Sequence, residues 1–254
     1  MRDFTLITYK KLLVSLINRG YEFQTVEQFI KAPKDKVVVL RHDSDIWPKN
    51  DWKMALVEYE LGIKSTYYFR VPETSDEFVI NEIVKLNHEI GYHYEDLVRT
   101  NGNLDAAYNN FEKNLAFLRN FYPVTTCSRH GRPLSKIESL NLWKHFDFKS
   151  KFNLKGEVYL DIDYSDILYL TDNGSRWDAH ESNVRDFVTN SKYSISVSTT
   201  FDLIQAINQN RVPNKIILNC HPARWNNNLI IWSYRFVLQH IKNVAKRGLK
   251  KIRT

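Results

Sequence analysis

Apolar residues recur along the chain with two periods, and these periods predict which segments are strands and which are helices. Apolar runs of strand length predict buried strands, over 36–41, 65–70, 89–92, 124–128, 159–163, 167–171, 194–198 and 215–219. Apolar residues spaced three or four apart predict helices, over 6–19, 48–61, 76–87, 104–120, 135–145, 201–208 and 229–249. Because strands and helices alternate, we expect parallel pairing in an α/β fold, a distorted β/α barrel of about seven strands.

One domain is expected over the whole of 1–254, since no repeat, low-complexity tract or flexible linker interrupts the pattern. Within it we distinguish an N-terminal helical extension over 1–35 and a basic C-terminal helix over 229–254. No apolar run approaches the roughly 20 residues of a membrane span, and no basic segment followed by an apolar one opens the chain. We therefore expect a soluble protein that is not secreted and works in the cytoplasm.

The net charge and the two cysteines indicate which partners and which metal sites to expect. The net charge is +7, and six lysines and arginines crowd the last 13 residues. Such a segment is usually the solvated end of a helix, and otherwise it contacts anionic membrane lipid. Nucleic acid is not expected, because no repeated basic and aromatic surface accompanies the charges. Cys127 and Cys220 form no Cys-x-x-Cys pair, so we expect buried fillers rather than a zinc knuckle.

Acidic and imidazole side chains follow four of the predicted strands. Asp43 and Asp45 come directly after the apolar run 37–40, and His93, His130 and His221 end three later strands. In parallel sheets and barrels the carboxyl ends of the strands meet at one mouth, where chemistry takes place. These residues therefore predict one metal-dependent site, in which one aspartate of the pair binds the ion and the other stays free as a base.

Other residues near predicted strand ends suit a substrate. His221 is placed to protonate a leaving amine. Arg129 can orient a carboxylate by a forked hydrogen bond and keep Asp43 ionised. Aromatic and polar side chains together suit a sugar, with an apolar face for stacking and polar groups for hydroxyls; the candidates are Arg176, Trp177, Asp178 and Trp225.

These motifs, in this order, resemble the polysaccharide deacetylase family, the carbohydrate esterases (family 4) that remove N-acetyl groups from sugars. The resemblance covers roughly residues 36–225 and rests on five short segments. They are Arg41-His42-Asp43-Ser44-Asp45, Gly62-Ile63-Lys64-Ser65-Thr66-Tyr67-Tyr68-Phe69, His88-Glu89-Ile90-Gly91-Tyr92-His93, Arg129 with Pro133, and Leu218 to His221. The resemblance implies a distorted barrel with one divalent metal, commonly zinc. It also implies that Asp43 is the base, Asp45 and His93 bind the metal, and His221 is the acid.

One departure from the family pattern concerns the third metal ligand. The family's second histidine usually lies four residues after the first, where this chain has Leu97. His130 is the expected replacement, and Glu95 is the alternative. The resemblance implies removal of an acetyl group from a sugar in surface polysaccharide or glycoconjugate biosynthesis. The positive charge favours a substrate linked to phosphate or a nucleotide. The alternative function is a non-catalytic carbohydrate-binding protein on a degenerate barrel.

Overall fold

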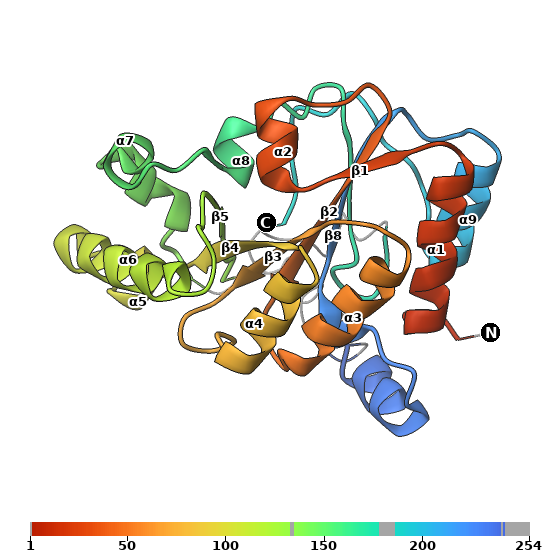
Figure 1. Ribbon diagram of the computed structural model, residues 1–254, viewed down its shortest axis with the longest axis horizontal. Coiled ribbons are helices and arrows are strands. Elements are labelled where there is room, and N and C mark those ends of the chain that lie inside the picture. Colours follow the sequence, from red (N-terminus) through yellow and green to blue (C-terminus); the bar gives the residue numbers. More distant parts are fainter. Residues whose placement is uncertain (1, 133–134, 178–185, 240, 242–254) are drawn as a thin grey trace.

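Eight parallel strands form the sheet at the centre of the computed structural model, which describes residues 2–132, 135–177, 186–239 and 241 (Figure 1). Their order is β6-β5-β4-β3-β2-β8-β7, and β1 pairs with β2 beside this path. The sheet curls into an incomplete barrel, which confirms the predicted fold class. The strands are β1 (Glu22–Gln24), β2 (Val37–Ser44), β3 (Thr66–Phe69), β4 (Glu89–Tyr94), β5 (Thr126–Arg129), β6 (Gly156–Glu157), β7 (Leu168–Thr171) and β8 (Lys215–Cys220).

Strand β2 is the centre of the sheet, and all eight of its residues are buried. Its first half, Val37–Val39, pairs with β1, and its second half, Arg41–Ser44, pairs with β3. Its other edge pairs with β8 along Val37–His42. The last strand therefore lies beside the strand that carries the first motif, as expected from a barrel.

Successive residues of β2 point to opposite faces of the sheet. Val38 and Leu40 join the core that packs under α1 (Leu6–Asn18) and α9 (Thr200–Asn208). Val37 and Val39 join the core on the opposite face, with Tyr68, Tyr169 and Ile217. The same alternation sends His42 and Asp43, which are neighbours in sequence, to different surroundings.

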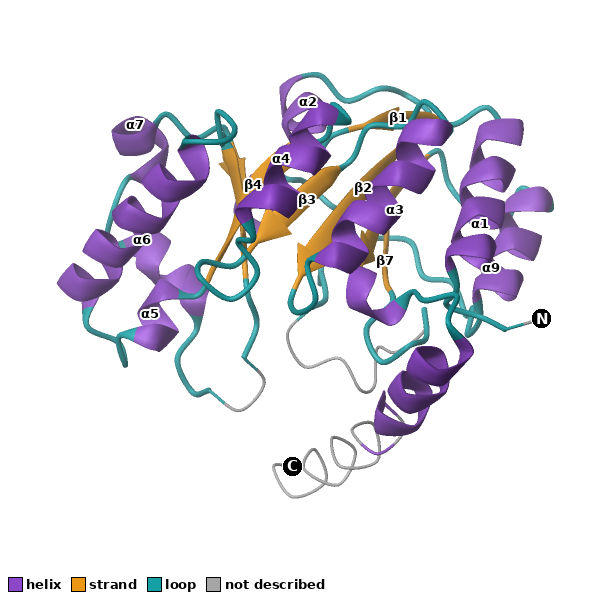
Figure 2. Cartoon of the chain, turned by 60° about the horizontal axis from the view of Figure 1, so that its bottom comes forward, coloured by secondary structure: helices purple, strands orange, loops and turns teal. Residues whose placement is uncertain are grey.

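Helices surround the sheet (Figure 2). Several begin at side chains that cap the first turn: Asp76 accepts from Val79 N, Asn103 from Ala106 N, and Thr199 from Asp202 N. The remaining helices are α2 (Val26–Lys31), α3 (Lys49–Glu60), α4 (Glu77–Lys85), α5 (Asp96–Arg99), α6 (Leu104–Arg119), α7 (Phe148–Phe152) and α8 (Val158–Asp161). Two short 3-10 helices are η1 (Ser139–Lys144) and η3 (Pro222–Arg224), and 229–239 is also helical.

Two predicted strands are wrong. The segment 159–163 falls largely in helix α8, because the carboxylate of Glu157 accepts hydrogen bonds from the backbone N–H groups of Tyr159 and Leu160 and turns the chain. The segment 194–198 is not a strand. Its alternation reflects the packing of Ile195 and Val197 against the core without a neighbouring strand to pair with.

Residues 1–35, expected as a helical extension, are built into the domain. Leu12, Leu13 and Leu16 of α1 are completely buried, and β1 joins the sheet. Cys127 and Cys220 are buried and free, as expected. Within the described ranges, no helix combines the length and the apolar character needed to cross a bilayer.

Candidate metal centre and active site

The four motif-bearing strand ends meet at one place. Asp43 lies near the end of β2 and Asp45 just beyond it, while His93 lies in β4. His130 follows β5 and His221 follows β8. These five side chains come from β5, β4, β2 and β8, four of the five strands in the consecutive stretch β5-β4-β3-β2-β8 of the sheet.

Asp45, His93 and His130 form a group with the geometry of a metal site. The Nε2 atoms of His93 and His130 lie 3.7 and 3.5 Å from Asp45 Oδ1. One ligand atom from each residue lies within 4.8 Å of the other two. Ligands about 2.1 Å from a tetrahedral zinc ion are about 3.4 Å apart. Asp45 Oδ1 is buried and has no hydrogen-bond partner. The residues therefore fit a divalent ion.

Both histidines are held so that Nε2 faces this group. His93 Nδ1 lies 3.0 Å from the carbonyl oxygen of Ser128, which can only accept a hydrogen bond. His130 Nδ1 lies 2.8 Å from Glu95 Oε2. With Nδ1 as the donor, Nε2 keeps the lone pair that binds a metal. Burial lowers the pKa of His93 well below its ordinary value, and the neighbouring His130 lowers it further, so a neutral imidazole is favoured.

Glu95 was the alternative third ligand, and the structure places it behind His130 instead. Its side chain is 1% exposed and contacts the guanidinium groups of Arg70, Arg99 and Arg132. Although burial alone would raise the pKa of Glu95, hydrogen bonds from His130 and Arg132 hold it well below the ordinary carboxyl range. Glu95 is therefore an anion that orients His130, an arrangement common behind metal-bound histidines.

Asp43 lies beside the metal group and is paired with Arg41, two residues earlier on the same strand face. Arg41 Nε and Nη2 donate to the two carboxylate oxygens at 3.0 and 2.8 Å, and Asn219 Nδ2 donates at 3.1 Å. His93 Nε2 lies 3.7 Å from Asp43 Oδ2. A forked arginine pair fixes the orientation of a carboxylate. Arg41 and Asn219 thus hold the Asp43 carboxylate in place next to the site.

Arg41, rather than Arg129, supplies the cation beside Asp43, which corrects the sequence prediction. The Arg129 guanidinium pairs with Glu138 and lies over the ring of Tyr159. The signal for Arg41 was present in the sequence, because residues two apart on a strand share a face.

His221 approaches Asp45 from the other side. Its Nε2 lies 3.9 Å from Asp45 Oδ2, while its Nδ1 lies 2.6 Å from Asp172 Oδ1. Asp172 is buried and also accepts from Arg224 Nη1 and Trp225 Nε1. Burial and Arg224 alone would lower the pKa of His221, but Asp172 raises it above its ordinary value. Asp172 was not assigned a role from the sequence.

The predicted sugar-binding aromatics do not line the site. Trp177 and Trp225 are each 1% exposed, and their rings pack in the core with Phe4. Their indole N–H groups are bonded to Thr200 and to Asp172. Neither ring has a free face for a sugar, so we no longer assign them to substrate contact.

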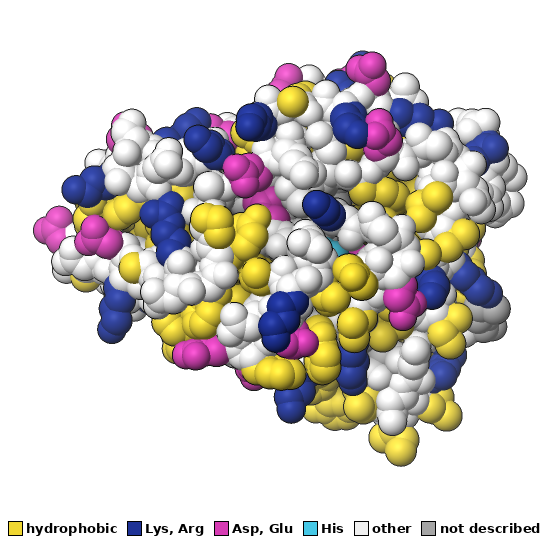
Figure 3. Space-filling model, viewed as in Figure 1, with side chains coloured by type: hydrophobic (Ala, Val, Ile, Leu, Met, Phe, Trp, Pro, Cys, Tyr) yellow, Lys and Arg dark blue, Asp and Glu magenta, His cyan; other side chains and the backbone are white. Residues whose placement is uncertain are grey.

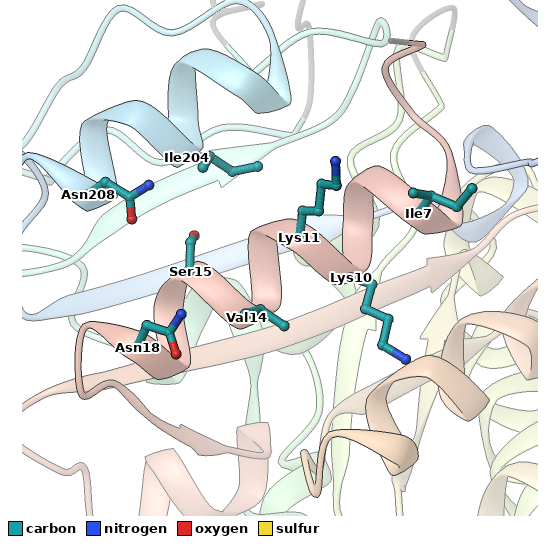
Figure 4. A pocket seen from close by; sticks show the side chains of 8 residues that line it. All are labelled: Ile7, Lys10, Lys11, Val14, Ser15, Asn18, Ile204 and Asn208. Carbon is teal, nitrogen blue, oxygen red and sulfur yellow. The ribbon is translucent and has the colours of Figure 1, made fainter.

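Arg176 and Asp178 were also predicted to contact the substrate. The exposed Arg176 donates from Nη2 to Ser198 Oγ at 2.8 Å. Asp178 lies outside the described residues. A separate surface hollow lies between α1 and α9 (Figure 4), and it shares no residue with the metal group. Its lining residues are Ile7, Lys10, Lys11, Val14, Ser15, Asn18, Ile204 and Asn208.

Comparison with known proteins finds similar structures but no similar sequences. No protein-family model matches the chain, and no curated protein does. The chain is similar to a CE4-family pseudoenzyme from Bacillus anthracis, with 13% identity and a TM-score of 0.44 over 84% of this chain and 62% of that one. A mutant of that pseudoenzyme, described as having restored enzymatic activity, matches with 14% identity and a TM-score of 0.44 over 85% and 65%.

A third similar structure is the CE4 domain of a multidomain xylanase from the hindgut metagenome of Trinervitermes trinervoides. It matches with 14% identity and a TM-score of 0.40 over 85% of each chain. All three belong to the family that the sequence resembles. This chain spans less than two thirds of the pseudoenzyme chains. Because these TM-scores are below 0.5, we infer what the chain does from its own residues.

Proposed function

We propose that the protein is a metal-dependent hydrolase that removes an N-acetyl group from a sugar or a sugar-linked intermediate. The observation that carries this proposal is the unpartnered Asp45 oxygen with two imidazole Nε2 atoms beside it and the second carboxylate, Asp43, next to them. The sugar and the acetyl group come from the resemblance of the sequence motifs. We place the substrate in polysaccharide or glycoconjugate biosynthesis, and we keep the cytoplasm as the expected location.

Each residue has one role in this proposal. Asp45, His93 and His130 would hold a divalent ion, with zinc expected because two of the three donors are imidazoles. Such an ion, when bound, polarises a carbonyl oxygen and acidifies water. Asp43, oriented by the forked hydrogen bonds of Arg41, accepts the proton of the attacking water.

His221 completes the proposed chemistry on the other side of Asp45. Its Nδ1 donates to Asp172, which leaves Nε2 facing the reacting centre. The raised pKa of His221 favours the protonated imidazole, which can protonate a departing amine. Asp172 touches no reacting atom and is a positioning residue.

The spatial arrangement favours this proposal over a non-catalytic sugar-binding protein. That alternative rested on the missing histidine four residues after His93. His130, which reaches the group from the end of β5, supplies an imidazole at 3.5 Å from Asp45 instead.

Metal binding tests the proposal directly. We expect the purified protein to bind about one zinc ion and to melt at a higher temperature with zinc, because a ligand that binds only the native state stabilises it. Asp45→Ala, His93→Ala and His130→Ala should each lose the ion and this response. His145→Ala, which alters an exposed histidine elsewhere, should keep both. Full zinc occupancy in all three site variants would refute the ligand assignment.

Substrate choice tests His221. His221→Ala should slow release of acetate from oligosaccharides of N-acetylglucosamine by about 10²–10⁴-fold. Its effect on an acetyl ester with a good leaving group should be much smaller, since such an alkoxide needs little protonation. Equal losses on both substrates would mean that His221 only binds or orients.

A further inference from the structure

The helix over 229–239 projects from the body of the protein after strand β8 (Figure 2), and one of its faces is apolar and exposed. The stripe consists of Ile230, Tyr234, Val237 and Ile241, which are 57–79% exposed. The spacing of four, three and four residues places them on one side of a helix. Hydrophobic side chains are visible at this projection in the space-filling view (Figure 3).

The opposite face of this helix is attached to the domain. Trp232 Nε1 donates to the carbonyl oxygen of Asp3 at 2.7 Å, and the Arg2 guanidinium lies over the Trp232 ring. Arg235 lies over the ring of Trp47, 4.7 Å from its centroid. These contacts fix which side faces the body, so the apolar stripe is directed outward.

The charge of the chain is divided unevenly. All 29 acidic residues lie at or before Asp202, where they outnumber the 26 lysines and arginines of that part. The residues after Asp202 contain ten lysines and arginines and no acidic residue. Six of these ten lie in residues 242–254, directly after the stripe, so the sequence that follows the stripe is strongly basic, whereas the chain up to Asp202 is slightly acidic.

An exposed apolar stripe that is followed in the sequence by a basic segment matches the surface of an anionic bilayer. Apolar side chains enter the boundary between headgroups and acyl chains, and lysines and arginines are attracted to the lipid phosphates. Nucleic acid fits less well, because the outward face presents apolar side chains rather than cations. A second copy of the same segment would bring like charges together.

The helix also lies close to the candidate metal centre. Trp47, which contacts Arg235, is two residues beyond Asp45, and both Ile46 and Trp47 are partly exposed. We propose that the helix over 229–239, together with Ile241, docks the protein on an anionic membrane, with the metal centre beside the bilayer surface. Only the consequence for catalysis, a preference for sugars anchored to lipid phosphate, rests on the proposed function.

Flotation of the full chain with lipid vesicles tests this docking. We expect binding to vesicles of phosphatidylcholine mixed with phosphatidylglycerol, weak binding to phosphatidylcholine alone, and loss of binding at high salt because the attraction to the anionic surface is screened. The double variant Ile230→Ser/Val237→Ser should lower the partition coefficient about tenfold or more, because two apolar contacts are lost. Its melting temperature should be unchanged.

A matched control and the zinc measurement separate this inference from the proposed function. Leu160→Ser removes an apolar side chain that is 50% exposed on α8, and it should bind vesicles like the wild type. Equal binding of the double variant would overturn the proposal. So would dimerisation without vesicle binding, or retention on DNA but not on vesicles. Vesicle binding that persists in Asp45→Ala would support docking independently of the metal centre.

Discussion

Two clusters of histidines and carboxylates lie on opposite faces of strand β2, and they differ in how their oxygens are satisfied. On one face, Glu58 Oε1 contacts Tyr9 OH and His42 Nε2, at 2.5 and 2.7 Å. Glu58 Oε2 accepts from Ser65 Oγ and Tyr67 OH, at 2.5 and 2.9 Å. Each oxygen of this buried carboxylate therefore meets two partners from the protein itself.

On the other face, Asp45 Oδ1 has no hydrogen-bond partner, although imidazole Nε2 atoms lie 3.5 and 3.7 Å away. These separations are too long for hydrogen bonds and suit two ligands of one ion. Residue type does not separate a structural cluster from a metal site here. The surroundings of the carboxylate oxygens do, since Asp45 Oδ1 has no hydrogen-bond partner and faces two imidazole Nε2 atoms, and only the three-dimensional arrangement reveals this.

The largest expected effect concerns the proposed base. Asp43→Asn preserves the shape of the side chain but cannot accept a proton, so we expect turnover to fall about 10²–10⁴-fold. Zinc content should stay at the wild-type level, because Asp45, His93 and His130 are intact. Steady-state rates and metal analysis measure the two quantities. Asp105→Asn, an exposed carboxylate on α6, is the control. Wild-type turnover in Asp43→Asn would place the base elsewhere.

Substitution in the Glu58 cluster, on the other face of β2, should lower stability rather than turnover. Glu58→Gln removes the anion that His42 and three hydroxyl groups surround, and breaking such a buried arrangement costs about 3–5 kcal/mol of unfolding free energy. Chemical denaturation measures this loss. Zinc affinity of the folded protein should change little, because Glu58 contacts no residue of the metal group. A stable Glu58→Gln variant with impaired zinc binding would reverse the comparison.

The pH dependence of the unfolding free energy tests the role of Glu58 independently. Although burial alone would raise its pKa, His42 and hydrogen-bond donors lower it to about 2 from an ordinary 4.5. A depressed carboxyl pKa stabilises the native state above pH 4.5, and this contribution is lost as the pH falls toward 2. Glu58→Gln should flatten that part of the curve. An unchanged slope would mean that other carboxyl groups dominate.

The sequence predicted which residues lie at the ends of the strands better than which side chains, far apart in the chain, contact one another. The apolar run 37–40 and the residues after it placed Asp43 and Asp45 correctly at the mouth, because strand direction alone decides this. The partners Arg41 and Asp172 received no role. Asp172 and His221 are 49 residues apart in the chain, and no local pattern reports such a contact.

Two of the sequence predictions, for Trp177 and for residues 159–163, are wrong for physical reasons that the spacing of apolar and polar residues does not reveal. Trp177 looked suited to stacking on a sugar, but nothing in its local sequence distinguishes a ring in a site from a ring in the core. The segment 159–163 has the alternation of a strand, yet a single carboxylate, Glu157, supplies hydrogen bonds that begin a helix there. The spacing of apolar residues shows which side chains are buried. Whether the backbone forms a strand or a helix depends on strand pairing and on hydrogen bonds that cap a helix.

A smaller effect is expected behind the metal ligands. Glu95→Gln leaves His130 in place but replaces the anion that orients it, so zinc affinity should fall about 10–100-fold. Titration with zinc in competition with a chelator measures this change. Glu138→Gln, which alters a carboxylate paired with Arg129 rather than with a histidine, is the matched control. Equal losses in both variants would assign Glu95 a general rather than a ligand-orienting role.

The smallest expected effect compares two neighbouring tyrosines on opposite faces of β3. Tyr67 OH donates to the carboxylate of Glu58 at 2.9 Å, and Tyr68 OH donates to the hydroxyl of Thr126 at 3.0 Å. Both rings are completely buried. Hydrogen bonds to charged groups contribute more than those between neutral groups, so Tyr67→Phe should cost about 2 kcal/mol and Tyr68→Phe about 1 kcal/mol. Urea unfolding of both variants measures the difference. If Tyr68→Phe costs as much as Tyr67→Phe, the Glu58 cluster does not depend on its charge, and the contrast between the two faces of β2 loses its electrostatic basis.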